Sequence, residues 1–200
     1  MELHSPNDGS VDPRLILEGQ LRECYGRVVY SHKTHEKCAD LLLSRLATVK
    51  GAQIALSAAT TAGFIGAAFG SGTASALIGV AISTVLLGLN AYTKNYDLGE
   101  LAQKHKQAAN DLWVVREKYL SLLADLNMRR VGLDTLRDQR DSLLKELHAA
   151  YAGAPSTTFR AYREAQRALK QSEDLTFSDA EIDAFLPREL RREPQAPPPE

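Results

Sequence analysis

The sequence predicts an all-α fold in which a two-helix transmembrane hairpin is flanked by long cytoplasmic helices that form an antiparallel coiled-coil-like bundle. Two observations predict it. Residues 51–93 contain no Asp, Glu, Lys, Arg or His. On both sides of this run, apolar residues recur at alternating steps of four and three, which is the period of a helix seam. No segment shows the alternation that is typical of a β-strand.

The composition is consistent with a cytosol-facing chain that has no strong charge bias. The chain has 200 residues and a formal net charge of −1, which implies no general attraction to nucleic acids or anionic membranes. The cysteines Cys24 and Cys38 do not form the paired framework of a small secreted protein, so we expect reduced thiols. Residues 1–13 lack the basic and apolar regions of a signal peptide, and we expect a disordered N-terminus there.

A cytoplasmic amphipathic helix is expected over residues 14–50, leading directly into the uncharged run. Charged residues fill the faces away from its seam. The predicted seam consists of Leu21, Tyr25, Val28, His32, His35, Ala39, Leu42 and Leu46.

The uncharged run, residues 51–93, has the length of two membrane crossings and a turn. A bilayer core of about 30 Å needs about 20 helical residues per crossing. Glycines at the midpoint, in Gly70-Ser71-Gly72, predict the turn. We therefore expect transmembrane spans over residues 52–69 and 73–92.

Basic residues lie near the outer ends of both spans, whereas the turn at Gly70 carries no charge. The positive-inside rule therefore predicts that both termini are cytoplasmic. These basic residues are Arg45, Lys50, Lys94, Lys104 and Lys106.

Polar and small residues share one face of each span. Gln53, Ser57 and Thr60 follow helical spacing in the first span, and Ser83 and Asn90 lie on a small-residue stripe of the second. Two interpretations stay open: close helix packing, or the lining of a water-filled path. A soluble alternative, in which the other helices wrap a buried Ala-rich hairpin, would require extensive cover from the remaining chain.

Residues 94–193 are expected to form a second cytoplasmic helical region, followed by a disordered tail at 194–200. Gly132 and Asp134 predict a helix break and an N-cap, and Ser156 or Thr157 is expected to cap a further helix. Ser178 begins a capping-box pattern before a short last helix. The seam expected to pair with the first helix consists of Leu101, His105, Ala108, Leu112, Val115, Tyr119, Leu122 and Leu126.

The sequence predicts neither an enzyme nor a cofactor. None of the common catalytic or nucleotide-binding motifs occurs, so no catalytic residue is assigned. His32, His35 and Cys38, with Cys24 upstream, have zinc-compatible side chains, but seam histidines beside a buried cysteine are the commoner arrangement. We therefore predict no metal site.

Arginine-rich helix faces are the candidates for binding an anionic ligand, either a nucleotide or an anionic lipid. Arginine makes bidentate contacts with phosphate, although a solvated charged face is the usual explanation of such a pattern. The predicted ligand residues are Arg160, Arg163, Arg167, Lys170, Arg129 and Arg130, the last two in a group with Arg137 and Arg140, while Arg188, Arg191 and Arg192 form a third group.

The order of these features resembles the SLATT family of bacterial two-transmembrane effectors, over the region from about Leu17 to Arg192. The resemblance depends on the uncharged hairpin and on segments before and after it. These segments are Tyr25–His32, His105–Leu112 with Arg116–Tyr119, Arg140–Leu147, Ala154-Pro155, Tyr162–Ala165 and Glu181–Pro187.

The resemblance implies a membrane-disrupting or pore-forming effector of anti-phage systems, located in the bacterial inner membrane. It also implies a partner nucleotidyltransferase that makes a cyclic nucleotide or oligonucleotide signal. Because two helices cannot enclose a pore, we expect a homo-oligomer, such as a tetramer or another small ring, in the lipid bilayer. The alternative is a non-conducting membrane-anchored scaffold that recruits partners through its coiled-coil helices.

Overall fold

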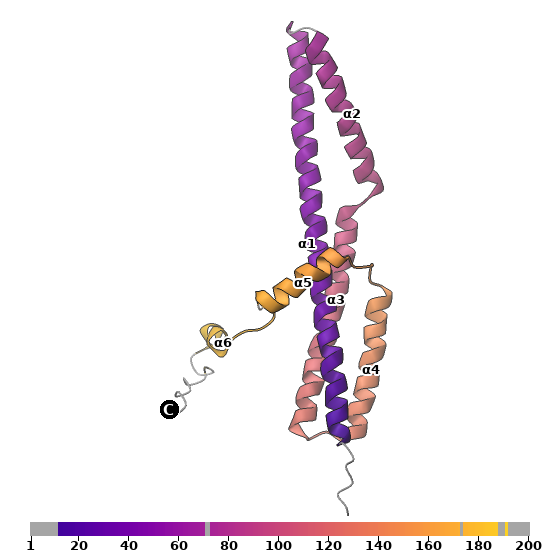
Figure 1. Cartoon of the computed structure of the whole chain (residues 1–200), viewed down its shortest axis with the longest axis vertical. Coiled ribbons are helices and arrows are strands. Elements are labelled where there is room, and N and C mark those ends of the chain that lie inside the picture. Colours follow the sequence, from indigo (N-terminus) through magenta and orange to yellow (C-terminus); the bar gives the residue numbers. More distant parts are fainter. Residues whose placement is uncertain (1–11, 71–72, 173, 188–190, 192–200) are drawn as a thin grey trace, which may run out of the picture.

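The computed structural model confirms the all-α fold. It describes residues 12–70, 73–172, 174–187 and 191, so most of the predicted N-terminal and C-terminal tails lie outside the described residues. The described helices are α1 (Pro13–Ala68), α2 (Thr73–Asn95), α3 (Leu98–Met128), α4 (Leu133–Ala152), α5 (Phe159–Gln171) and α6 (Asp179–Phe185). Figure 1 shows an elongated molecule with the hairpin of α1 and α2 at one end and a stalk of α1, α3 and α4 at the other.

Helix α1 runs without interruption from the stalk into the hairpin. It spans 56 residues, which corresponds to about 84 Å at 1.5 Å per residue. Pro13 occupies the first turn, where its missing N–H costs nothing, and the Asp12 carboxylate accepts a hydrogen bond from the Arg14 amide at 2.9 Å. Since one helix crosses the boundary near residue 50, the stalk and hairpin are mechanically continuous.

The stalk core confirms most of the predicted seam. Helices α1 and α3 pack along each other, and α4 covers their apolar side near the end remote from the hairpin (Figure 1). Leu101 was predicted to lie in the seam but is exposed, and Ala102 is buried instead, because α3 starts at Leu98 and its buried face runs through that residue and Ala102. The largest fully buried side chains are Tyr119, Leu21, Leu112, Leu136 and Val28.

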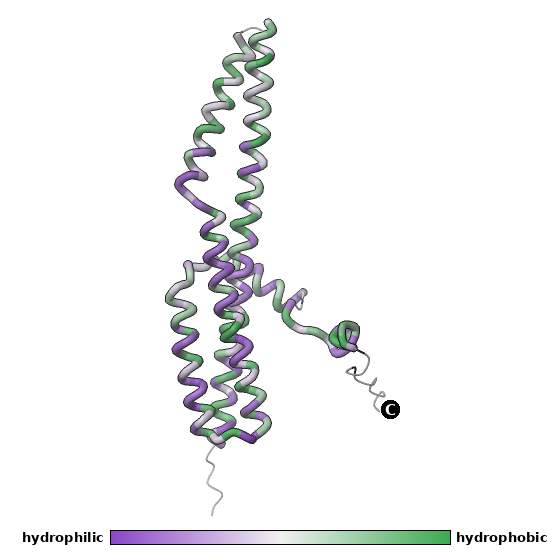
Figure 2. The backbone as a smooth tube through the Cα atoms, turned by 180° about the vertical axis from the view of Figure 1, so that it is seen from behind, coloured by the Kyte–Doolittle hydropathy of each residue, from purple (hydrophilic) through white to green (hydrophobic). Residues whose placement is uncertain are grey.

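The hairpin stands free of the other helices. Helix α2 packs against α1, and its connection to α3 is a two-residue break at Tyr96 and Asp97, after which the Asp97 carboxylate caps α3 through the Glu100 amide at 2.8 Å. Figure 2 shows that the upper part of the hairpin is predominantly hydrophobic. Large apolar side chains are exposed along it, Ile54 and Leu87 among them. The wrapped, soluble hairpin is therefore not the arrangement of this chain.

By length and composition, one helical stretch among the described residues, beginning at Thr73, is apolar enough to cross a membrane, and only 6% of its apolar window is buried. A core helix of a soluble protein would instead be mostly buried. The hairpin end of α1 is not among such helices, which fits its content of Gln53, Ser57 and Thr60.

Two of the predicted helix caps are wrong. Gly132, not Asp134, is the N-cap of α4, because the chain leaves α3 through a left-handed Arg129 (φ 56°) and becomes helical immediately after the glycine. Thr158, not Ser156 or Thr157, caps α5, with its hydroxyl accepting the Ala161 amide at 3.2 Å. The capping box of Ser178 and Glu181 at the start of α6 is confirmed.

Candidate functional site

The two hairpin helices lie close together at two glycines. A Cβ atom added to Gly63 would lie 3.6 Å from the Cα atom of Gly79, and one added to Gly79 would lie 3.6 Å from the Phe64 ring. Gly79 is the buried residue of α2. These distances leave room for a single methyl group at van der Waals contact, whereas a larger side chain would separate the helices.

The polar candidates in the hairpin divide into two groups. The Gln53 side-chain amide donates to Asn90 Oδ1 at 2.8 Å and to Thr93 Oγ1 at 3.3 Å, which joins the hairpin helices near their base. The hydroxyls of Ser57 and Thr60 donate to carbonyls four residues earlier in their own helix. Ser57 and Ser83 are exposed on the hairpin surface. The structure therefore brings Gln53 and Asn90 together and leaves the two serines facing outward.

A pair of buried imidazoles joins α1 to α3 within the stalk. The Nδ1 atoms of His35 and His105 lie 3.0 Å apart, so one ring must donate a proton to the other. Burial, with smaller effects from the neighbouring imidazoles of His105 and His32, lowers the pKa of His35 to about 4. Burial also lowers the pKa of His105. The pair is therefore neutral at physiological pH.

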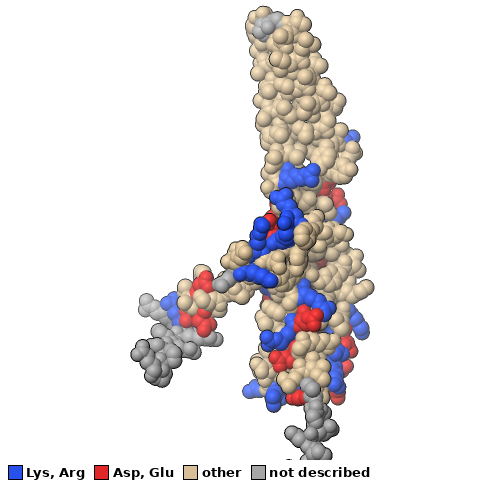
Figure 3. Space-filling model, viewed as in Figure 1, with Lys and Arg blue, Asp and Glu red and all other residues tan. Residues whose placement is uncertain are grey.

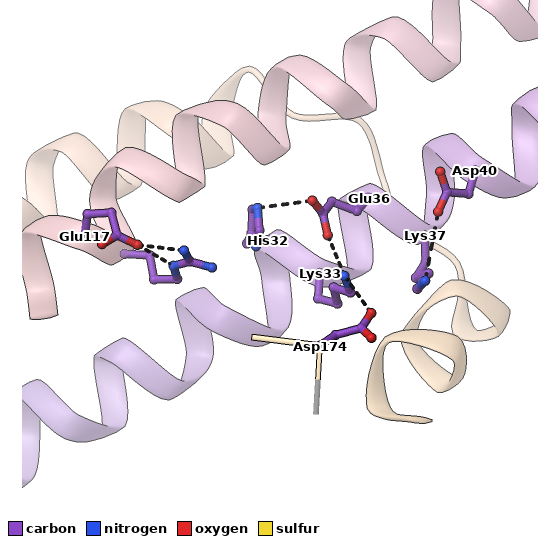
Figure 4. Close-up of polar contacts among 8 residues, drawn as sticks. His32, Lys33, Glu36, Lys37, Asp40, Glu117 and Asp174 are labelled. Atoms are coloured by element: carbon purple, nitrogen blue, oxygen red, sulfur yellow. Dashed lines mark hydrogen bonds and ion pairs between the residues drawn. The ribbon is translucent and has the colours of Figure 1, made fainter. Parts of the chain in front are cut away.

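An ionic network on the same turns of α1 ties the segment after α5 to the stalk. The buried Lys33 ammonium lies 2.9 Å from both the Glu36 carboxylate and the Asp174 carboxylate (Figure 4). His32 Nε2 lies 3.6 Å from Glu36, and burial lowers the pKa of His32. Across the described part of the chain, no three His, Cys, Asp or Glu side chains are arranged to hold a metal ion.

The predicted basic groups lie at opposite ends of the stalk. Arg129 and Arg130 follow α3 at the end remote from the hairpin, whereas the basic face of α5 lies where α5 crosses α1 near the hairpin base (Figure 1). One ligand site therefore cannot include both groups. Of the third group, Arg188 and Arg192 lie outside the described residues, and the Arg191 guanidinium donates to the Leu186 carbonyl at 2.9 Å.

The basic residues of α5 differ in their surroundings. The Arg163 guanidinium lies 5.2 Å from the centre of the Phe159 ring, and Arg167 pairs with Glu164 at 3.1 Å. Lys170 is exposed in the last turn. Arg160, in the first turn, lines a cavity.

This cavity, which we call the junction cavity, lies between α1, α3 and the start of α5. Its volume is about 580 Å³. Figure 3 shows that Lys and Arg side chains gather at the base of the uncharged hairpin and over α5 on this face of the molecule. The polar residues lining the junction cavity are Ser44, Arg45, Thr48, His105, Ser156, Thr158 and Arg160.

Arg45 is the residue of this cavity that sequence reasoning did not assign to a ligand site. It was interpreted only as a marker of membrane orientation. Arg45 and Arg160 lie far apart in the sequence and line the same cavity only because α5 folds back across α1. In the sequence, serine and threonine residues lie close to each of the two arginines. This pattern indicates a ligand site only when the two segments are known to be adjacent.

Comparison with known proteins supports the assignment made from the sequence. No curated protein and no solved structure matches the chain. The model of the SMODS and SLOG-associating 2TM effector domain family 4 matches residues 17–181, which include the stalk, the hairpin and α5. The match confirms the resemblance to the SLATT family. The chain belongs to this family of two-transmembrane effector domains and is therefore a membrane effector of conflict systems.

Proposed function

We propose that this chain is the pore-forming effector of a bacterial anti-phage system, in which several copies assemble in the inner membrane and open a path for ions. Both termini lie in the cytoplasm, and a nucleotide or oligonucleotide signal from a partner nucleotidyltransferase controls opening. The chain itself performs no catalytic step.

The observation that carries the proposal is the uncovered hairpin with outward-facing serines. Exposed apolar side chains suit contact with lipid, whereas the hydroxyls of Ser57 and Ser83 do not. In a ring of copies these small polar side chains would lie between neighbouring hairpins or toward a water-filled centre. The Ser57 hydroxyl already donates to the Gln53 carbonyl, so the argument depends on the outward position of the serines and not on a missing hydrogen bond.

The continuity of α1 supports control from the cytoplasm. A change in the packing of α1 against α3 or α5 moves a helix that also forms one wall of the hairpin. A ligand that prefers one of two stalk packings would shift the hairpin accordingly.

Membrane potential in bacterial cells that express the protein tests this proposal. We expect the wild-type protein, in the presence of its signal-producing partner, to depolarise the cells. The double variant Ser57→Leu with Ser83→Leu should remain in the membrane fraction and should fail to depolarise them. Val80→Leu with Val85→Leu, at exposed apolar positions of α2, is the matched control and should depolarise like wild type.

Two results would contradict the proposal. One is an unchanged potential with wild-type protein present in the membrane, which would favour the non-conducting scaffold. The other is normal depolarisation by the serine double variant.

A further inference from the structure

We propose that the junction cavity is a phosphate-binding site in which the guanidinium groups of Arg45 and Arg160 hold the phosphate oxygens. The inference deepens the proposed function by locating the site of an anionic signal, and it depends on that function only for the consequence of binding.

The net positive charge of its lining distinguishes the junction cavity from the cavities toward the other end of the stalk. Two arginines line it, and none of its lining residues is acidic. The cavity at the far end of the stalk includes Asp12 and Glu18, and the groove between α3 and α4 includes Asp125 and Glu146. The junction cavity therefore has uncompensated positive charge, which favours an anion.

The two arginines are free to bind a ligand. Among the described residues, no carboxylate forms an ion pair with Arg45 or Arg160; the Arg45 guanidinium instead lies 5.7 Å from the centre of the Tyr92 ring. Both side chains are exposed. An arginine that is positioned by an aromatic ring and lacks an acidic partner can offer its bidentate face to phosphate.

Hydroxyl groups complete the set of donors around the arginines. Ser44 contributes from α1, and Ser156 and Thr158 contribute from the segment that leads into α5. The Thr48 hydroxyl also lines the cavity but donates to the Ser44 carbonyl at 3.0 Å, so only its oxygen faces a ligand as an acceptor. The Thr158 oxygen accepts the Ala161 amide, which leaves the Thr158 hydroxyl hydrogen able to donate to a ligand. The positive end of the α5 dipole lies at the same place and adds to the attraction.

The size and position of the cavity define the possible ligands. Its volume, about 580 Å³, lies within the range of about 300–1,000 Å³ that is usual for small-molecule sites. Arg45 precedes the uncharged run by about 9 Å of helix, so the site lies near the level expected for lipid headgroups. The phosphate can therefore belong to a soluble nucleotide or to an anionic lipid.

Phosphate binding would connect α5 to the base of the hairpin. The residues that hold the phosphate belong to α1 and to the first turn of α5, while His105 of α3 forms another wall. An occupied site would thus fix the position of α5 on the helix that continues into the membrane.

Binding is tested on the full chain in dodecyl maltoside micelles, which contain no phosphorus. Adenosine monophosphate is titrated and its ³¹P line width recorded, and in a second arm phosphatidylglycerol retained through gel filtration is quantified. We expect binding in at least one arm, weakened at least about tenfold in Arg45→Gln with Arg160→Gln because two charge-assisted contacts are lost. Arg163→Gln with Arg167→Gln removes the same charge from the same region and should bind within about twofold of wild type.

The two arms distinguish the source of the phosphate. Binding of adenosine monophosphate assigns the site to a soluble phosphate, and retention of phosphatidylglycerol assigns it to a lipid headgroup. Absence of both, or equal losses in the two double variants, would overturn the inference. Circular dichroism verifies folding, which should persist because both arginines are exposed. Binding without ion flux would refute only the pore, and flux without binding would refute only this site.

Discussion

The imidazole pair of His35 and His105 is expected to make the stability of the stalk depend on pH. The pair is buried between α1 and α3, with His32 on the adjoining turn. The Tyr151 and Tyr162 side chains from α4 and α5 line the small cavity beside His35. No carboxylate contributes to the pKa shift of His35, so a proton on either ring has little compensation.

The pair predicts that the stalk loses stability in mild acid. Unfolded His35 takes up a proton near pH 6.5, whereas the folded protein resists protonation until about pH 4. The unfolded state therefore binds more protons in this window, and the free energy of unfolding falls as the pH drops through it. We expect the full free energy of unfolding above pH 6.5. Near pH 4 it should be lower by an amount on the order of 2 kcal/mol.

Thermal unfolding in detergent between pH 7.5 and 4.5 measures this effect. His35→Gln should flatten the dependence of the melting temperature on pH. His148→Gln replaces an exposed histidine of α4 and should leave the dependence as in wild type. Equal pH profiles for wild type and His35→Gln would contradict the role of the pair.

Lys33 is expected to hold α5 and the residues that follow it, including Asp174, on the stalk. Lys33→Met removes the ammonium group shared by Glu36 and Asp174. Because Asp174 keeps partial contact with water, we expect the attachment of α5 to the stalk to weaken by only about 1 kcal/mol. This corresponds to about fivefold faster hydrogen exchange of the α5 amides. Lys37→Met, on the same helix with a looser pair to Asp40 at 4.0 Å, is the matched control and should exchange like wild type. Unchanged exchange in Lys33→Met would show that apolar packing alone holds α5.

Among the helices, α1 and α2 pack closely at Gly63 and Gly79. Gly79→Leu should force the hairpin helices apart, because the new side chain would have to displace Phe64. Overpacking of this kind costs about 1–3 kcal/mol. Gly88→Leu on the same helix has nothing within 4 Å of the added Cβ atom and should be nearly neutral.

Distances between spin labels on α1 and α2, after replacement of both native cysteines, report the separation of the hairpin helices. A longer distance in Gly79→Leu, with the wild-type distance in Gly88→Leu, is the expected outcome. Identical distances in all three proteins would mean that the hairpin is not packed through Gly79.

Local patterns in the sequence are sufficient to predict most of the helices, but they do not predict how the helices pack together. The alternating steps of four and three identified the faces that bury Val28, Leu112 and Tyr119, since burial along one helix follows its period. The exposed Leu101 shows the limit of this method, because a short break before α3 sets which residues face inward.

The position of α5 could not be predicted from periodicity. It depends on contacts between segments more than 100 residues apart, such as the stacking of Tyr30 on Tyr162 of α5 and, for the end of α4 that precedes it, the hydrogen bond between Ser31 and Tyr151 at 2.7 Å. Neither contact leaves a repeat in the sequence. For the same reason the basic residues of α5 were predicted as one face, whereas the structure places only Arg160 of that face at the junction cavity.

The whole molecule combines a hydrated stalk with an uncovered apolar hairpin. Figures 1 and 3 show that charged residues occupy the stalk and α5, while the hairpin is free of them on the face shown. A soluble monomer would not leave such a surface in water. Membrane insertion removes the apolar surface from water, and assembly of several copies would give the hairpin serines polar surroundings.

Ion flux through liposomes that contain the purified full-length chain tests the central claim most directly. With a potassium gradient and a potential-sensitive dye, we expect wild-type protein in phosphatidylglycerol-containing liposomes to dissipate the potential when the activating nucleotide signal is supplied. The Ser57→Leu with Ser83→Leu variant, reconstituted at the same density, should hold the potential. If wild-type protein never conducts in any combination of lipid, nucleotide signal and partner protein, the pore is contradicted and the scaffold is the remaining function.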